Sequence, residues 1–355
     1  MTLTLTSSAA MTTDDHAPID LSTLSKWVLP NTLLWLENVE KEERASREDI
    51  EKEGLNYGAG LFDTEADREE ESELQHNRVG TWITSASGSD GGFDWTENEV
   101  QNDQCPKICA GVSVIYTTST SSEGHGNTVW ASARHISNLL GNRESCRQVL
   151  SPLLRQRQRE STPATSQQKH PLFGLSFVEL GAGAGVPSWT AMRCGARVVC
   201  TDQSVADRIR CIAECAERNW RDMKKTESEA VLENAKMARS CPYNWGAPIE
   251  EVTLSLDKNE LFDVVIAADC CYMPFLQPKL LKSIDMLMSK EGVALVSFAL
   301  HGNAPDEDVW GVVDRAKELG FCVEVLEPKQ LTPSTYGMEL KQGLVQTVRL
   351  TRQLC

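Results

Sequence analysis

The chain of 355 residues carries 51 Asp and Glu against 35 Lys and Arg, a net charge of −16, and 41% of its residues are hydrophobic. This length and hydrophobic content fit one large domain with an extension, or two domains. The acidic balance disfavours nonspecific nucleic-acid binding, which needs a basic face to displace counterions, and no apolar run approaches the length of a membrane span. We therefore predict neither a nucleic-acid nor a membrane partner.

The N-terminal hundred residues predict an extension. Residues 1–19 are rich in Ser and Thr but lack Arg, which predicts a disordered tail and disfavours a secretory or transit peptide. Apolar residues from Asp20 to Val39 predict helical structure interrupted before Pro30. Residues 37–73 hold 15 Asp and Glu against five Lys and Arg, which is typical of a solvated helix face or a linker. We assign 20–107 to an acidic extension of helices and loops without a catalytic role.

Regular structure is predicted again from residue 108 onward. The run 108–116 is typical of a strand, 127–140 leads into an amphipathic helix, and the polar run 151–171 predicts an exposed insertion. From Phe177 the chain alternates strand and helix, which favours a parallel sheet covered on both faces. The last two strands, 321–326 and 344–350, predict an antiparallel pair. We therefore expect one α/β domain over 108–355 with seven mostly parallel strands.

A glycine-rich turn follows the first of these strands. The strand 177–180 runs into Gly181-Ala182-Gly183-Ala184-Gly185 and then a helix. Bare backbone lets a ligand approach closely, and the helix N-terminus supplies free N–H groups. Asp202, which ends the next strand 21 residues after Gly181, can accept both hydroxyls of a ribose. Val186 takes the place of the final small residue in the dinucleotide fingerprint, so the pattern favours a nucleoside cofactor other than NAD.

Four segments together carry a family resemblance. They are Glu179–Gly185, Asn127–Ala133, Tyr243-Asn244-Trp245-Gly246 and Ala268-Asp269-Cys270-Cys271-Tyr272. The first resembles the opening motif of class I S-adenosylmethionine-dependent methyltransferases, which have a Rossmann-like fold. The set is similar to the methyltransferase-16 family of seven-strand lysine methyltransferases, over residues 108–352. Within that family, the Trp130 segment and His301 resemble the elongation factor 1-alpha branch, whose older name is nicotinamide N-methyltransferase-like.

The resemblance implies S-adenosylmethionine as cofactor and a set of residues around it. The implied cofactor contacts are Trp130, Glu179, Gly181, Ala182, Gly183, Asp202, Trp245 and Ala268. Asp269 and Tyr272 are the candidates to orient the methyl-accepting amine, by positioning rather than as a general base. A lysine must first lose its proton, against an ordinary pKa of about 10.4, and desolvation lowers that pKa. Packing or capping roles remain open for these side chains, and His125, His135 and His301 are expected outside the catalytic set.

The cysteines predict the compartment and exclude a zinc site. Twelve cysteines in a chain for which we predict no secretory signal favour reduced thiols in the cytoplasm or nucleus. The pairs Cys105/Cys109 and Cys211/Cys215 have neither the spacing nor the His partners of a structural zinc site. We therefore expect no metal, and we expect a monomer.

The predicted function is N-methylation of a lysine or N-terminal amine of a protein, with a translation elongation factor as the implied substrate. Three alternatives remain open: a small-molecule N-methyltransferase acting on nicotinamide, a catalytically silent binding module on the same fold, and, least favoured, an NAD-dependent dehydrogenase. Turnover that survived Asp202→Ala would favour the silent module. Competition by nicotinamide would favour the small-molecule enzyme. The sequence fixes neither the acceptor nor the number of methyl groups added.

Overall fold

The computed structural model describes residues 19–56, 78–84, 93–96, 111–118, 128–160, 169–257, 260–302, 304–331 and 343–352. Residues 1–18 of the predicted tail 1–19, the Cys105/Cys109 pair and His125 lie outside these residues. So do most of the acidic run beyond residue 56 and the predicted insertion between 161 and 168.

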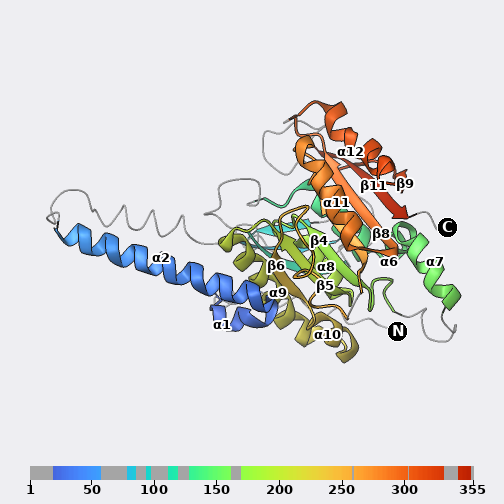
Figure 1. Cartoon of the computed structure of the whole chain (residues 1–355). Helices are drawn as coiled ribbons and strands as arrows, with labels where there is room; N and C mark the ends of the chain where they lie inside the picture. The colour runs from blue at the N-terminus through green and yellow to red at the C-terminus, as the bar shows by residue number, and fades with distance from the viewer. Residues whose placement is uncertain are drawn as a thin grey trace.

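A mostly parallel sheet forms the centre of the molecule (Figure 1). Its order is β10-β11-β8-β7-β4-β5-β6, with β9 also paired to β11. The strands are β4 Ser176–Leu180, β5 Arg197–Asp202, β6 Arg239–Pro242, β7 Phe262–Ala268, β8 Met288–Ala299, β9 Phe321–Val325, β10 Lys329–Gln330 and β11 Leu344–Arg352. Strands β4 to β8 are parallel, whereas β11 is antiparallel to β8 and β9. The predicted α/β fold is confirmed, with an eighth strand added because the two residues of β10 pair with β11.

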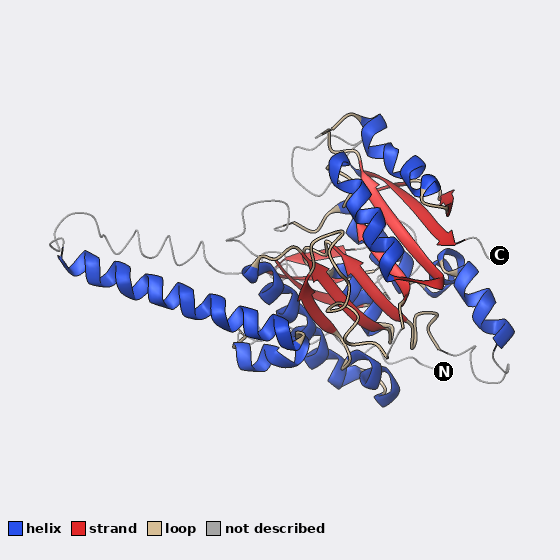
Figure 2. Ribbon diagram, viewed as in Figure 1, coloured by secondary structure: helices blue, strands red, loops and turns tan. Residues whose placement is uncertain are grey.

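Helices cover both faces of this sheet (Figure 2). One core contains side chains of α5, α8 and α9, and the other contains side chains of α11 and α12. Every residue of β4 and β7 is buried, which is why these strands are mostly apolar in the sequence, with Ser176, Glu179 and Asp263 as the exceptions. The helices after residue 128 are α5 Ala131–Gly141, α6 Arg143–Val149, α7 Ser151–Glu160, α8 Val186–Arg193, α9 Ala206–Thr226, α10 Glu229–Ala235, η4 Pro274–Leu276, α11 Gln277–Leu287 and α12 Asp306–Glu318.

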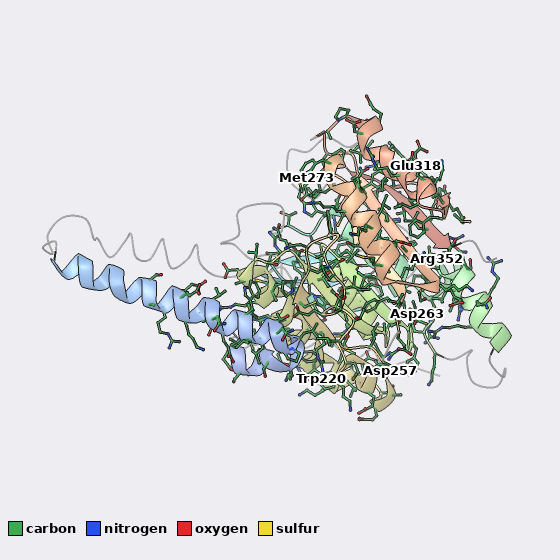
Figure 3. The ribbon with its side chains drawn as sticks, viewed as in Figure 1. Trp220, Asp257, Asp263, Met273, Glu318 and Arg352 are labelled. Atoms are coloured by element: carbon green, nitrogen blue, oxygen red, sulfur yellow. The ribbon has the colours of Figure 1, made fainter. Side chains whose placement is uncertain are left out.

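The start of the N-terminal extension wraps around the edge strand β6. Two short helices, α1 (Leu21–Leu24) and the 3₁₀ helix η2 (Ser25–Trp27), precede a parallel bridge between Val28 and Ser240 of β6. Trp27 is 1% exposed in the core on one face, and Leu29 is buried in the core on the other. Trp27 donates its indole N–H to Glu217 of α9 (2.7 Å) and meets the Trp220 ring edge-on at 5.8 Å (Figure 3). This segment covers an edge that would otherwise present unpaired backbone groups.

A second, smaller sheet joins residues from both sides of the predicted boundary at 107/108. Its order is β2-β1-β3, all antiparallel, from β1 (Arg78–Ile83), β2 (Phe93–Thr96) and β3 (Ser113–Thr118). The Asn219 side chain of α9 holds β3 by accepting from Ile115 N (3.0 Å) and donating to Ile115 O (2.6 Å). The boundary itself stays a prediction, since the extension contributes both to this sheet and to the main core.

The acidic run begins as a helix, as predicted. Helix α2 (Pro30–Asn56) starts beside β6 and extends away from the sheets (Figure 1). Leu36 near its start is fully buried, and Glu40 pairs with Arg210 of α9 at 3.0 Å. Among the described residues, no helix is both long and apolar enough to cross a membrane.

The expectation of an exposed insertion at 151–171 was wrong for its first half. These residues form helix α7, whose Leu153 is only 1% exposed. Arg157 donates to Asp263 Oδ1 at 2.7 Å, and the other oxygen of Asp263 accepts from Ser176 N at 2.8 Å (Figure 3). One buried carboxylate therefore ties α7 to the starts of β4 and β7, a long-range contact that local polarity does not reveal.

Replacing Trp27 tests whether the wrapped segment belongs to the folded core. Trp27→Ala removes a buried indole and its hydrogen bond to Glu217, so we expect a loss of about 3–5 kcal/mol in the free energy of unfolding, measured by urea titration. Leu34→Ala, at a residue 57% exposed, is the control and should cost little. A Trp27→Ala variant as stable as the control would contradict the packing described.

Candidate active site

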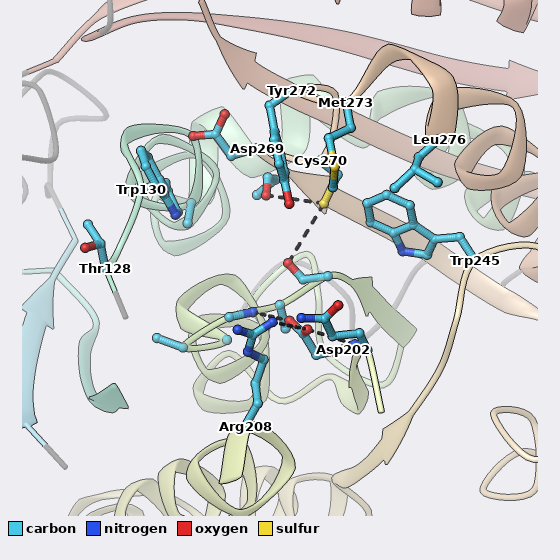
Figure 4. Close-up of a pocket in the computed structure, with 18 of the residues that line it drawn as sticks. Thr128, Trp130, Asp202, Arg208, Trp245, Asp269, Cys270, Tyr272, Met273 and Leu276 are labelled. Carbon is cyan, nitrogen blue, oxygen red and sulfur yellow. Dashed lines mark hydrogen bonds and ion pairs between the residues drawn. The ribbon is translucent and has the colours of Figure 1, made fainter. Parts of the chain in front are cut away.

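A cavity of about 450 Å³ opens where the parallel strands end (Figure 4). Its lining comes from the residues that follow β4, β5, β6, β7 and β8, and from the segment that enters α5. All the predicted site residues except Glu179 line it. The structure thus brings together Trp130, Gly181, Ala182, Gly183, Asp202, Trp245, Ala268, Asp269 and Tyr272.

The glycine-rich turn requires glycine for two different reasons. Gly181 has φ +68°, and a Cβ placed on it would lie 2.9 Å from Cys270 Sγ and 3.0 Å from Trp245 Cζ2. Gly183 has φ +56°, but a Cβ there would meet no described atom within 4 Å. Gly181 therefore allows the turn to pack under Trp245, while Gly183 leaves bare backbone beside open space, as a closely bound ligand needs.

Asp202 is buried and already well partnered. Its Oδ2 accepts from Gly183 N at 2.7 Å, and its Oδ1 accepts from Gln203 N at 2.8 Å and from Arg208 at 3.1 Å. A carboxylate offers about four acceptor positions, so these three bonds leave about one, on Oδ2. In this arrangement Asp202 has room for one of the two ribose hydroxyls that the sequence predicts, and a second would take the place of Arg208 on Oδ1. The sequence reading missed Arg208, whose only local signal is a basic side chain in the first turn of α9.

The Trp245 loop is anchored to α11. Tyr243 donates its hydroxyl to Ala247 O at 3.0 Å and is 3.1 Å from the Ser283 hydroxyl, which also accepts from Gly246 N at 2.7 Å. These bonds fix both ends of the Trp245 loop. The indole lies beside the cavity, on the side across from Trp130 (Figure 4), where an aromatic face can cover a purine.

Asp269 has an unusual backbone and an unsatisfied oxygen. It is the only described non-glycine residue with positive φ (+59°), a conformation that is rare and costly outside glycine. Its Oδ1 contacts His301 Nε2 at 2.8 Å and accepts from Ala299 N at 3.3 Å. Its Oδ2 is buried without a hydrogen-bond partner among the described residues. A buried carboxylate oxygen without a donor is costly, so Oδ2 suits a cationic or N–H-bearing partner at the wall of the cavity that Asp269 lines.

Two aromatic rings flank this acid. The Trp130 ring meets the His301 ring edge-on at 4.8 Å between centroids. Tyr272 points from the segment after β7 toward the glycine-rich turn (Figure 4), and burial is the largest cause that raises the pKa of its phenol. Its hydroxyl therefore stays protonated near neutral pH and can donate a hydrogen bond.

Glu179 lies behind the cavity rather than in it. Its buried Oε2 accepts from Ser188 N at 2.9 Å and from the Ser188 hydroxyl, which fixes α8 against β4. Complete burial raises the pKa of Glu179 to about 8. The structure thus favours the role of an acid that orients the turn over a direct contact with a cofactor.

Several lining residues were not expected. His301 was expected outside the catalytic set, yet its side chain is 6% exposed, lines the cavity and contacts Asp269. Cys270, Met273 and Leu276, in the segment after Asp269, also line the cavity, and none of the described residues of 141–171 does. Among the described residues, no group of three His, Cys, Asp or Glu side chains could hold a metal ion.

Comparison with known proteins identifies the family. Residues 113–308, more than half of the chain, match the family described as lysine methyltransferase. The chain belongs to the lysine methyltransferase family. This confirms the predicted family and agrees with S-adenosylmethionine as its cofactor. The observed site fits that molecule: open backbone at Gly183, an acceptor on Asp202 and an aromatic face at Trp245.

Three curated relatives each match part of the chain. The protein N-terminal and lysine N-methyltransferase efm7 of Aspergillus fumigatus is 34% identical over 129 residues, 35% of this chain and 46% of the relative. The EFM7 protein of Gibberella zeae is 30% identical over 167 residues, 44% and 61%. The protein N-lysine methyltransferase METTL21A of Xenopus tropicalis is 31% identical over 126 residues, 35% and 49%. The chain spans about half the length of the curated relatives it matches.

Removing the charge of Asp202 tests the cofactor contact. Asp202→Asn keeps the shape but weakens a charge-assisted hydrogen bond, so affinity for S-adenosylmethionine should fall roughly 10- to 100-fold in calorimetry. Asp222→Asn is the matched control, because Asp222 pairs with Arg193 at 2.8 Å and does not line the cavity. Equal affinity in both variants would remove Asp202 from the site.

The buried acid Glu179 predicts a pH dependence of stability. Its pKa rises from 4.5 to about 8 on folding, so between these values the native state holds a proton that the unfolded chain releases. The contribution of protonated Glu179 to the free energy of unfolding is therefore fully present below the unfolded pKa of 4.5. It is lost as the pH rises through about 8. From about pH 5.5 to about pH 7.5, wild type should lose more free energy of unfolding than Glu179→Gln, measured by urea titration. If wild type and Glu179→Gln lost the same free energy of unfolding over this pH range, Glu179 would be ionised in the folded state and the prediction would be wrong.

Proposed function

We propose that the chain, acting as a monomer, transfers a methyl group from S-adenosylmethionine to a lysine or N-terminal amine of a protein. The observation that carries this proposal is the open Oδ2 of Asp269, a buried acceptor at the carboxyl edge of the sheet. The family and the names of the curated relatives support the same reaction.

The residues around Asp269 suit an amine. Asp269 Oδ2 can accept an N–H from the acceptor, and the rings of Trp130 and Tyr272 can flank its carbon chain or its positive charge. The carboxylate favours the ammonium form on entry, whereas burial between aromatic rings favours the neutral amine. Both forms are needed in turn, because only the neutral amine has a free lone pair.

The mechanism proposed for these residues is alignment. When bound, S-adenosylmethionine supplies the electrophilic methyl group. Gly183 and Asp202 would bind the cofactor at one end of the cavity, and Asp269 and Tyr272 orient the amine at the other end. The amine releases its proton to water before the methyl transfer, so no residue has to act as a strong base. During the transfer these residues exclude solvent and fix the direction from which the amine approaches the methyl group.

A protein acceptor is favoured over a small molecule by the rim of the cavity. Phe275 is 74% exposed, the most exposed of the large hydrophobic residues described, and lies in the chain between Met273 and Leu276, which both line the cavity. Exposed aromatic residues beside a pocket are frequent anchors in protein interfaces. A ligand confined to the cavity would leave this ring in water.

The acceptor and the compartment follow as finer proposals. The resemblance to the elongation factor 1-alpha branch makes a translation elongation factor the first candidate to assay. The nine cysteines among the described residues are all free, and eight are buried, which supports a reducing compartment, the cytoplasm or nucleus.

The direct test is to incubate the purified chain with tritium-methyl S-adenosylmethionine and a cell lysate, and then to separate proteins from small molecules. We expect label in a protein band, and methyl-lysine or a methylated N-terminus after hydrolysis. Label confined to small molecules, or removed by competing nicotinamide, would replace the proposal by the small-molecule reading. No label in any fraction would favour a silent binding module.

Replacing the exposed ring tests the protein interface. Phe275→Ala should raise the lysate concentration that half-saturates the labelling rate by roughly tenfold, while calorimetry with S-adenosylmethionine stays unchanged. Leu254→Ala, at a residue 58% exposed that does not line the cavity, is the control. If both variants behave like wild type, Phe275 has no part in substrate docking.

A further inference from the structure

The contact between His301 and Asp269 joins two parallel strands at the edge of the cavity. Asp269 directly follows β7, and His301 lies two residues beyond the end of β8. Ala268 pairs with Ser297 in the ladder, and Asp269 N continues it by donating to Ser297 O at 2.7 Å. This register places side chains 32 residues apart in the sequence within 2.8 Å of each other. Both side chains are almost fully buried, at 4% and 6% exposure.

The two oxygens of Asp269 have different surroundings. Oδ1 receives His301 Nε2 and the amide of Ala299, whereas Oδ2 has no partner among the described residues. Rotation about the last side-chain torsion of an Asp is broad, so the backbone alone does not fix which oxygen meets His301 and which stays without a partner. The 2.8 Å contact between His301 Nε2 and Oδ1 removes this freedom.

We propose that His301 is a positioning residue, which donates its Nε2–H to Asp269 Oδ1 so that Oδ2 is presented to the methyl-accepting amine. This inference rests on the proposed function. An ionised carboxylate only accepts hydrogen bonds, so Nε2 is the nitrogen that carries the proton. The edge-on contact at 4.8 Å between the rings of Trp130 and His301 limits rotation of the imidazole. His301 thus acts through Asp269 and does not itself take the proton of the amine.

The same arrangement explains why the strained backbone of Asp269 is tolerated. A positive φ costs a non-glycine residue of order 1–3 kcal/mol. The contacts with Ser297, Ala299 and His301 offset that cost, and all three residues belong to β8 or follow it directly. Strain held by neighbouring contacts is a feature of functional sites, where it sets the direction of a side chain.

The test compares two replacements of similar length, one with a hydrogen-bond donor and one without. His301→Gln keeps an N–H near the place of Nε2, and His301→Met keeps the bulk but has no donor. We expect the maximal rate of tritium-methyl labelling of a fixed lysate to fall roughly 10- to 100-fold in His301→Met, because a small misplacement of reacting groups costs about that much. His301→Gln should recover most of the rate. Affinity for S-adenosylmethionine by calorimetry should stay within about twofold in both.

The Asp269→Asn background separates positioning from a merely structural role. If His301 acts through the carboxylate of Asp269, His301→Gln and His301→Met should have similar labelling rates when each is combined with Asp269→Asn. Equal rates for Gln and Met with Asp269 intact, or loss of rate only through lower cofactor affinity or a lower unfolding midpoint, would overturn the proposal.

A readout independent of turnover keeps this inference distinct from the proposed function. ¹⁵N NMR of the imidazole should find the proton of His301 on Nε2 in wild type, and a changed proton distribution between the two ring nitrogens in Asp269→Asn. A wild-type chain that labels nothing would refute the methyl transfer. A proton on Nδ1 alone in an active wild type would refute the positioning role of His301.

Discussion

The parallel pairing of β4 with its neighbours β5 and β7, and of β7 with β8, is the constraint on which the site depends. Parallel strands end at the same edge of a sheet, so the last residue of each strand and the residues that follow it lie close together at that edge. β4 delivers the glycine-rich turn, β5 delivers Asp202, β7 delivers Asp269, and β8 delivers His301. A slip of one residue in any of these registers would turn a polar side chain away from the cavity.

Two acids at this edge have opposite surroundings. Asp202 has three hydrogen-bond donors, including the guanidinium of Arg208, so it can add little more than one contact to a neutral hydroxyl. Asp269 lines the same cavity and keeps one buried oxygen, Oδ2, without a donor among the described residues, which suits an amine. A carboxylate therefore has a different role at each end of the cavity. The roles differ because the ends of the strands place different hydrogen-bond donors beside Asp202 and Asp269. Glu179, a third acid nearby, is buried away from both and supports the turn.

Local patterns predicted the parts of the site that are close together in the sequence. The apolar run before Gly181, the alternate glycines and the distance to Asp202 reflect one strand–turn–helix unit, so a short stretch of sequence is enough to find them. The Arg208–Asp202 and His301–Asp269 contacts depend on how helices and strands pack, and no local pattern identifies them. The same limit applies to Trp27 and Leu29: the apolar residues from Asp20 to Val39 predicted helical structure, but not that the chain would wrap around β6. Sequence alone left both roles of Glu179 open, because an acid beside a cofactor turn and an acid that holds such a turn look alike in sequence.

The most direct test of the central claim is a calorimetric titration of the purified wild-type chain with S-adenosylmethionine and, separately, with NAD. The structure and the family predict saturable binding of S-adenosylmethionine at about one molecule per chain and no measurable binding of NAD. Binding of NAD, or of neither molecule, would contradict the assignment of this cavity as an S-adenosylmethionine site and with it the proposed transfer to an amine at Asp269.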